Sequence, residues 1–270
     1  MHELNLKASD DVELFGRLWI PDNPRGGVIL VHGLGEHGGR YGDFPGYFLE
    51  RNIALCAPDL RGHGKSGGRR GDFSNIDVLL KDIELFQRHL EAIINGKPIF
   101  LYGHSMGGTV ALLFAEKSPN ISGAVITSPW LKLVNPPTRL SIALAKLLDR
   151  IAPGLTLSNG IRSEELSGGE SESGEYDSDP LVHDRISVRA FLALREAASH
   201  LRHDAVFASP LLFMHGTADP ITSYRATMGL ASETESPFLT WPGFLHEIHR
   251  EPGGEKSLAA AASWIGAALE

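Results

Sequence analysis

The chain has 270 residues, of which 42% are hydrophobic and 21% are charged, and its formal net charge is −8 at pH 7. A chain of this size can bury a large core in one domain, and its single cysteine, Cys56, excludes a disulfide framework. The negative balance argues against nonspecific binding to nucleic acid or to anionic membranes, which needs clustered Lys and Arg.

Taken in chain order, the sequence begins without a basic segment followed by an apolar one, so we expect no signal peptide and a cytoplasmic protein. Short strand-like runs then alternate with helical patterns. Strands are expected at residues 12–20, 28–32, 53–57, 98–102, 122–127, 210–214 and 237–241. Several are continuously apolar, which is typical of parallel strands buried on both faces. With helices expected at residues 77–94, 106–117, 226–231 and 255–269, the pattern predicts an α/β fold: a mostly parallel central sheet flanked by helices.

Residues 129–204 interrupt this alternation with two apolar helical patterns and no clear strand. They are expected to form a helical cap inserted into a core of residues 1–128 and 205–270. Within the cap, residues 164–179 carry seven acidic residues and no Lys or Arg, which predicts a solvated loop. The apolar helix faces could pack on the core or line a pocket for an apolar chain.

Two segments match the pattern G-x-S-x-G, at residues 103–107 and 64–68. A nucleophilic serine in this pattern sits on a sharp turn between a strand and a helix. Ser105 has the apolar run IFLY before it and VALLF after it, whereas Ser66 lies in a polar, glycine-rich loop. We therefore predict Ser105 as the nucleophile.

Two further glycine patterns suggest nucleotide binding. Lys65 and Ser66 resemble the end of a phosphate-binding P-loop, but Asp59 stands where its first glycine belongs. The segment at residues 33–38 fits G-x-G-x-x-G after a strand, and Asp59 lies where a ribose-binding acid is expected. Against a dinucleotide site, Pro45 follows too closely for the helix that should open there, and Glu36 would repel the pyrophosphate. A dinucleotide-binding oxidoreductase is kept as a rival interpretation.

A serine hydroxyl needs a base to take its proton and an acid to orient that base. In α/β-hydrolases the order along the chain is nucleophile, acid, histidine. Asp219 follows an apolar strand through a short turn and is the candidate acid, although an aspartate before a proline can also simply cap the turn. His246 and His249 both lie beyond it, and spacing alone does not choose between them. A zinc-binding H-E-x-x-H would need a histidine in place of Arg250, so no metal is expected.

The negative charge that develops on the substrate needs backbone N–H donors. We predict the N–H of Met106, directly after the nucleophile, and the N–H of Leu34, in the loop after the strand at residues 28–32. His32 and His104 are expected to support these turns by hydrogen bonds.

With these residues in place, the sequence resembles the monoglyceride lipase and lysophospholipase branch of the α/β-hydrolase family. The resemblance rests on residues 32–37 with 40–41, 59–67, 103–108, 179–183, 215–219 and 246–249. It implies an α/β-hydrolase fold with a helical lid, no cofactor, and a Ser105–Asp219–His246 triad that hydrolyses a fatty acyl ester such as a monoacylglycerol. It also implies that Glu36, Arg40 and His249 line the alcohol end of the site, although Glu36 and Arg40 could form a surface ion pair.

The expected partner is a small acyl ester and not a nucleic acid, with transient contact between the lid and lipid aggregates as a further possibility. The oligomeric state is left open. The same fold also hosts lysophospholipid, thioester and amide hydrolysis, and a non-catalytic binding module is a further alternative.

Overall fold

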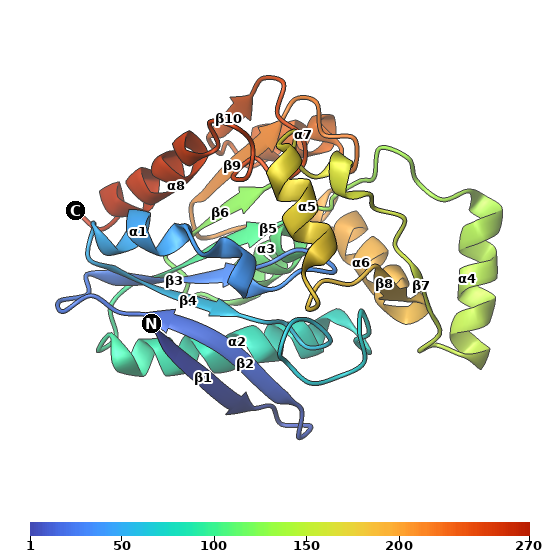
Figure 1. The fold of residues 1–270 in the computed structure, drawn as a ribbon, viewed down its shortest axis with the longest axis horizontal. Helices are drawn as coiled ribbons and strands as arrows, with labels where there is room; N and C mark the ends of the chain where they lie inside the picture. The colour runs from blue at the N-terminus through green and yellow to red at the C-terminus, as the bar shows by residue number, and fades with distance from the viewer.

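An eight-stranded sheet forms the centre of the molecule, with the strand order β1-β2-β4-β3-β5-β6-β9-β10 (Figure 1). The computed structural model describes the backbone of residues 1–270 and the side chains of residues 1–169 and 174–270. The strands are β1 (His2–Lys7), β2 (Glu13–Trp19), β3 (Gly26–Val31), β4 (Ile53–Pro58), β5 (Ile99–His104), β6 (Gly123–Thr127), β9 (Leu211–Gly216) and β10 (Phe238–Trp241). From β4 to β10 all neighbours are parallel, while β1 and β2 join antiparallel. The prediction of a mostly parallel central sheet is confirmed.

Helices cover both faces of this sheet, as expected for parallel strands that are buried on both sides (Figure 1). One face packs against α1 (Phe44–Leu49) and α8 (Glu255–Ala267). The other packs against α2 (Ile76–Ile93), α3 (Met106–Lys117), α6 (Val188–Leu201) and α7 (Tyr224–Glu233). No described helix is both long and apolar enough to cross a membrane.

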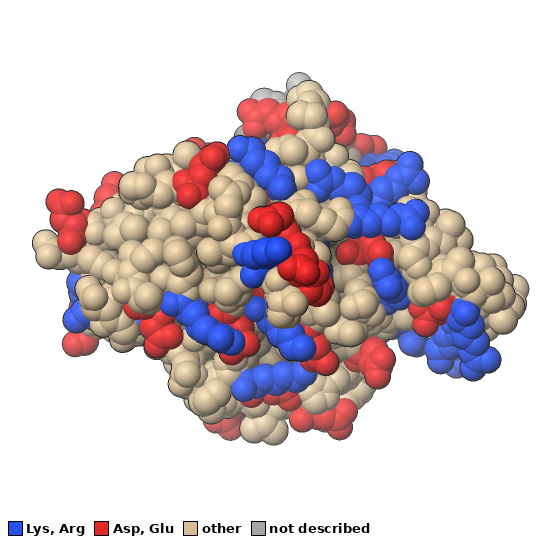
Figure 2. All heavy atoms as spheres, turned by 90° about the horizontal axis from the view of Figure 1, so that it is seen from below, with Lys and Arg blue, Asp and Glu red and all other residues tan. Residues whose placement is uncertain are grey.

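The surface mixes charges of both signs. On the face shown in Figure 2, Lys and Arg side chains alternate with Asp and Glu side chains, and neither sign forms a continuous field. A basic stripe is the electrostatic footprint of a nucleic-acid-binding surface, so this face gives no support to such a partner.

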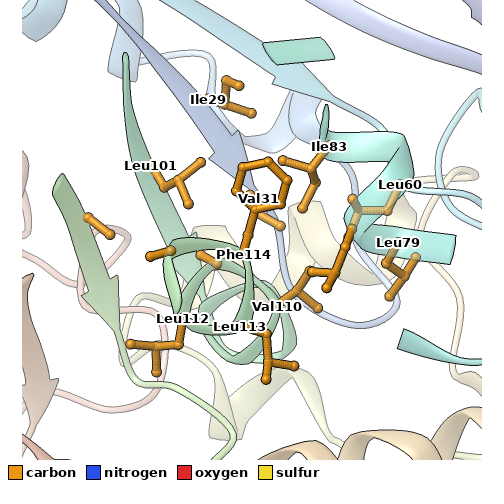
Figure 3. Close-up of a cluster of buried hydrophobic side chains, with 14 of the residues drawn as sticks. Ile29, Val31, Leu60, Leu79, Ile83, Leu101, Val110, Leu112, Leu113 and Phe114 are labelled. Atoms are coloured by element: carbon orange, nitrogen blue, oxygen red, sulfur yellow. The ribbon is translucent and has the colours of Figure 1, made fainter. Parts of the chain in front are cut away.

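The larger core cluster lies between the sheet and α2 and α3 (Figure 3). Ile29, Val31 and Leu101 project from β3 and β5 toward Val110 and Phe114 of α3, and all five are buried. Side chains of this kind contribute roughly 1.5–3 kcal/mol each when fully buried. The cluster therefore fixes α3, and with it the turn that precedes α3, against the middle of the sheet.

Two elements outside the inserted cap segment were not expected from the sequence. Strand β1 alternates exposed and half-buried residues at the edge of the sheet, and no continuous apolar run marks it. Helix α1 spans six residues and carries its proline near the start, where proline is tolerated because the missing N–H would have no intrahelical partner. After η1 (Gly38–Tyr41), a 3₁₀ turn, α1 is the only helix before β4.

The segment between β6 and β9 differs from the expectation in two ways. It contains α4 (Arg139–Ile151), β7 (Thr156–Ser158), η2 (Ser163–Glu165), α5 (Glu170–Ser178) and β8 (Arg185–Ser187) before α6. The expectation of no strand is wrong, because β7 and β8 pair antiparallel. The acidic tract was predicted as a loop, but its backbone forms η2 and α5. The solvation of residues 170–173 lies outside the described side chains.

The two apolar helices of this segment behave differently, which the sequence had left open. Helix α6 buries residues such as Ala190, Leu194 and Leu201 against the core. None of the 13 described residues of α4 is buried, and this helix projects from the body (Figure 1).

Candidate active site

Ser105 occupies a strained turn between β5 and α3. Its φ is 55° and its ψ is −119°, a combination that a residue with a side chain rarely adopts and that costs of the order of 1–3 kcal/mol. The flanking glycines make the turn possible: a Cβ on Gly107 would collide with the carbonyl of Val31, and one on Gly103 would lie 2.6 Å from the Cβ of Ala111. The side chain of Ser105 is thereby held at the carboxyl edge of the sheet.

The structure brings Ser105, His246 and Asp219 into one hydrogen-bonded chain. His246 Nε2 lies 2.8 Å from Ser105 Oγ, and His246 Nδ1 lies 2.8 Å from Asp219 Oδ2. Because an ionised carboxylate only accepts, Nδ1 carries the proton that faces Asp219, and in the neutral imidazole Nε2 is free to accept from the serine hydroxyl. A nucleophile, its base and the acid that orients the base are in place for acyl transfer.

A close approach of two loops aligns His246 with Asp219. Gly216, at the end of β9, lies against the carbonyls of Phe244 and Leu245, where a Cβ would collide. The Ala218 N–H donates to the Phe244 carbonyl at 3.0 Å. The glycine therefore lets the His246 loop rest directly on the turn that carries Asp219.

Asp219 also has partners that the sequence reasoning did not identify. Its Oδ2 accepts from His215 Nε2 at 2.9 Å and from Thr222 Oγ1 at 2.8 Å. Its Oδ1 accepts the N–H groups of Ile221 and Thr222, so the carboxylate caps its turn as well as facing His246. Burial alone would raise the pKa of Asp219, but the imidazoles of His246 and His215 hold it well below the usual range.

The electrostatics favour a basic His246. Burial alone would lower the pKa of His246, but the adjacent Asp219 carboxylate outweighs burial and raises the pKa above its ordinary value of 6.5. The ring also lies 4.8 Å from that of His104, whose Nδ1 pairs with Thr127 Oγ1. His246 can therefore hold the serine proton once it has taken it.

The two residues predicted to supply the oxyanion N–H groups, Leu34 and Met106, lie in the same region as Ser105. Met106 is the first residue of α3, and the first N–H groups of a helix have no intrahelical partner. Leu34 lines the same pocket as Ser105. As expected for turn support, His32 is buried and its Nε2 accepts from the Leu60 N–H at 2.9 Å. The oxyanion assignment itself remains a prediction.

Ser105 is one of the residues that line an apolar pocket of about 390 Å³. Apolar side chains from the segment between β6 and β9 and from the turn after β9 form much of its lining, and Ala145 of α4 is one of the lining residues. Among the lining residues are Trp130, Leu133, Leu157, Ile186, Phe191 and Ile221. The size and character of this pocket suit an acyl chain.

The three residues predicted for the alcohol end lie elsewhere. Arg40 and His249 line a second, polar pocket of about 560 Å³. The side chains of Glu36 and Arg40 are 4% and 5% exposed, so the alternative of a surface ion pair is wrong. Burial lowers the pKa of His249 to about 3, and neither of its ring nitrogens has a hydrogen-bond partner among the described residues. The alcohol-binding role stays a prediction.

Arg40 has two further partners, Glu247 and Tyr176, to which the sequence analysis gave no role. The guanidinium forms two hydrogen bonds with Glu247, at 2.7 and 2.9 Å, and it lies 4.7 Å from the ring of Tyr176. Ligand atoms of Glu36, His104 and Glu247 also lie within 4.8 Å of one another, as in a metal site. The Arg40 guanidinium donates hydrogen bonds to both of these carboxyl groups.

The structure also tests the competing glycine patterns. Ser66 Oγ accepts from the Phe15 N–H and donates to the Asp59 carbonyl, so this serine supports a turn. The Asp59 side chain is fully buried and accepts from Arg17, from the Gly38 N–H and from the Lys65 N–H. Only short helical turns follow the glycines, so the long helix of a dinucleotide site is missing from this described region. The buried Asp59 carboxylate binds groups of the protein and is not open to a ribose.

Known proteins share both the sequence and the fold. Residues 22–253 match the hydrolase family described as serine aminopeptidase, S33. The chain is 32% identical to monoglyceride lipase from Homo sapiens over 92% of its own length and 84% of that protein. It is also 33% identical to an abhydrolase domain-containing protein from Dictyostelium discoideum, of which it spans 29%. The crystal structure of a monoacylglycerol lipase from Paleococcus ferrophilus is 36% identical and has a TM-score of 0.84, covering 95% of this chain and 99% of that one.

The raised pKa of His246 predicts how the reactivity of Ser105 depends on pH. A protonated imidazole cannot take the serine proton, so the rate of labelling by a fluorophosphonate probe should fall about tenfold per pH unit below the pKa of His246. The midpoint should lie above 6.5, because Asp219 raises this pKa. Labelling rates from about pH 5 to about pH 9 test this. Ser105→Ala is the unlabelled control, and a rate that does not change with pH would contradict the assignment of His246 as the base.

Proposed function

Since the chain belongs to the serine aminopeptidase S33 family of hydrolases, we propose that it hydrolyses carboxylic esters, above all monoacylglycerols, through an acyl intermediate on Ser105. The observation that carries this proposal is the Ser105–His246–Asp219 chain of hydrogen bonds at the mouth of an apolar pocket. The similarity to proteins named monoglyceride lipase supports the choice of substrate.

The proposed reaction has two halves. Ser105 Oγ attacks the ester carbonyl while His246 Nε2 takes its proton, and the oxyanion accepts from the N–H groups of Leu34 and Met106. Protonated His246 then gives its proton to the departing alcohol, which leaves the acyl group on Ser105. A water molecule, deprotonated by His246, attacks this acyl group, and the released serine recovers a proton as the fatty acid leaves. Asp219 holds the imidazole in the required tautomer throughout.

The two pockets suggest how the substrate lies. The acyl chain occupies the apolar pocket beneath α4, because each buried CH₂ group contributes about 0.8 kcal/mol. The alcohol faces the opposite side, where Glu36, Arg40 and His249 were predicted to bind it. Of these three, His249 has ring nitrogens without partners among the described residues, so it has the most hydrogen-bonding capacity to offer a hydroxyl group.

Hydrolysis of 1-monoacylglycerols of increasing chain length, from about C2 to about C18, tests the proposal. We expect a rate that peaks at medium or long chains. Ser105→Ala should lower kcat by about a million-fold, as in other serine triads. Retention of most activity in this variant would contradict the nucleophile. Labelling of Ser105 without turnover of any monoacylglycerol would contradict the substrate, and lysophospholipids, thioesters and amides would then be assayed.

We further propose that α4 contacts lipid aggregates. Its exposed leucines form one apolar face, with Leu140 79%, Leu144 54% and Leu147 53% exposed. Helix α4 also carries three basic residues and one acidic residue, and blue and red side chains both lie beside the projection at the right-hand end of Figure 2. A helix with an apolar face and basic neighbours suits the boundary between headgroups and acyl chains.

The double variant Leu140→Ser/Leu147→Ser tests this contact. It should bind vesicles of monoacylglycerol and anionic phospholipid at least tenfold more weakly, because each leucine contributes roughly 1.5–3 kcal/mol when buried. Its hydrolysis of a soluble short-chain ester should be unchanged. Val206→Ser is the matched control, since Val206 is 80% exposed and lies outside α4. Equal cosedimentation of the double variant and the wild type with the vesicles would contradict the proposal.

A further inference from the structure

We infer that Glu36, Arg40 and Glu247 form a buried bridge that fixes the oxyanion loop, residues 33–36, relative to the loop that carries His246. Glu36 and Glu247 are then positioning residues for hydrolysis itself, whatever alcohol the ester contains. The inference rests on the proposed function, because an oxyanion loop matters only if Ser105 attacks an acyl group.

Glu36 binds the backbone of its own loop. Its Oε1 accepts the N–H of Gly33 at 2.6 Å and the hydroxyl of Tyr41 at 2.8 Å. Gly33 directly precedes Leu34, whose N–H is the proposed oxyanion donor, and a Cβ on Gly33 would lie 3.3 Å from the Cβ of Ser105. The carboxylate therefore holds the peptide next to the proposed donor, immediately beside the nucleophile.

Arg40 connects this carboxylate to the other side of the site. Its guanidinium donates to Glu36 Oε2 at 3.1 Å and to both oxygens of Glu247 at 2.7 and 2.9 Å. Glu247 directly follows His246, and its own N–H donates to the Leu166 carbonyl at 2.7 Å. The bridge thus joins the loop after β3 to the loop before α8, which are far apart in the sequence.

Burial makes this connection stiff. The side chains of Glu36, Arg40 and Glu247 are 4%, 5% and 3% exposed, so water cannot replace a lost partner easily. Burial raises the pKa of Glu36. It acts in the same direction on Glu247, but the Arg40 guanidinium outweighs it and lowers the pKa of that carboxyl. Because both carboxyl groups bind the same guanidinium, neither side chain can change its position without losing a hydrogen bond to Arg40.

The chemistry needs this stiffness because an oxyanion donor acts only at the right distance. Loss of one such donor costs about 10²–10³ in kcat, and a displacement of about 1 Å can cost 10²-fold. The oxyanion loop contains Gly33 and Gly35, which restrict the backbone little. Glu36 supplies the restraint that these glycines lack. Its carboxylate already accepts hydrogen bonds from Gly33, Tyr41 and Arg40, which leaves about one lone-pair site for a substrate hydroxyl.

The test compares two esters of the same acyl chain, a monoacylglycerol and a p-nitrophenyl ester, in Glu36→Ala and Glu36→Gln. We expect kcat/KM to fall by about 10- to 100-fold in Glu36→Ala, by the same factor for both esters. The affinity for a trifluoromethyl ketone, which forms an oxyanion on Ser105, should fall in parallel. Glu36→Gln keeps an acceptor for the Gly33 N–H and should lie between Glu36→Ala and the wild type.

Asp82→Asn is the matched control, because Asp82 is also a buried carboxylate paired with an arginine, Arg61. It should lower the melting temperature without changing kcat/KM. A loss confined to the monoacylglycerol would overturn the inference and make Glu36 an alcohol-binding residue. Unchanged kinetics in both Glu36 variants would overturn it as well.

A failure of the proposed function would give a different experimental result from a failure of the bridge. A wild-type protein that hydrolyses neither ester would contradict the function but not the bridge. In that case the rate at which a fluorophosphonate labels Ser105 still tests the bridge, because the phosphoryl oxygen of the adduct occupies the oxyanion position. A slower rate in Glu36→Ala would support the bridge, and an equal rate would overturn it.

Discussion

A serine held at a φ of 55° persists only where its surroundings allow no alternative, because the strain of roughly 1–3 kcal/mol must be offset by packing. Here β5 enters the turn from the centre of the sheet, and α3 leaves it buried along most of its length. Glycines at positions 103 and 107 remove the side chains that would obstruct the turn. The other parts of the site are arranged around this fixed point: the Asp219 turn, the His246 loop and the loop after β3 all meet Ser105 at one edge of the sheet.

Two kinds of environment meet at this edge. On one side, aliphatic and aromatic side chains line the pocket beneath α4. On the other, the carboxylates of Glu36 and Glu247 and the guanidinium of Arg40 lie almost fully buried against one another. An ester of a fatty acid and a small polyol has the same division between an apolar and a polar end. The scissile carbonyl joins these two ends, and Ser105 lies where the two environments meet.

The sequence predicted the parts of this arrangement that depend on local pattern. Parallel strands buried on both faces require continuous apolar runs, so the central strands were recognisable. The turn at Ser105 was recognisable from its glycine pattern between an apolar strand and an apolar helix. Strand β1 was missed because an edge strand needs no such run. The acidic tract was predicted as a loop because its composition is polar, but it forms η2 and α5. The spacing of His246 and His249 did not identify the base; the family resemblance implied His246, and in the structure its ring reaches Ser105. The bridge through Arg40 joins residues about 200 positions apart, and no local pattern predicts such a contact.

Helix α4 has one further consequence for how the acyl pocket opens. The elements that follow α4 are held by specific contacts. Strand β7 pairs with β8, and Arg189, at the start of α6, forms an ion pair with Asp72 in the segment between β4 and α2. Helix α4 itself has no buried residue among its described positions, so its local stability can be far below that of the whole domain. Displacement of α4, about four turns of helix, would therefore uncover the part of the apolar pocket that Ser141 and Ala145 line, while the sheet, the Ser105 turn and the charged bridge stay folded. Access to the pocket would then be governed by a local opening equilibrium, and mutations in the core that lower global stability need not change it.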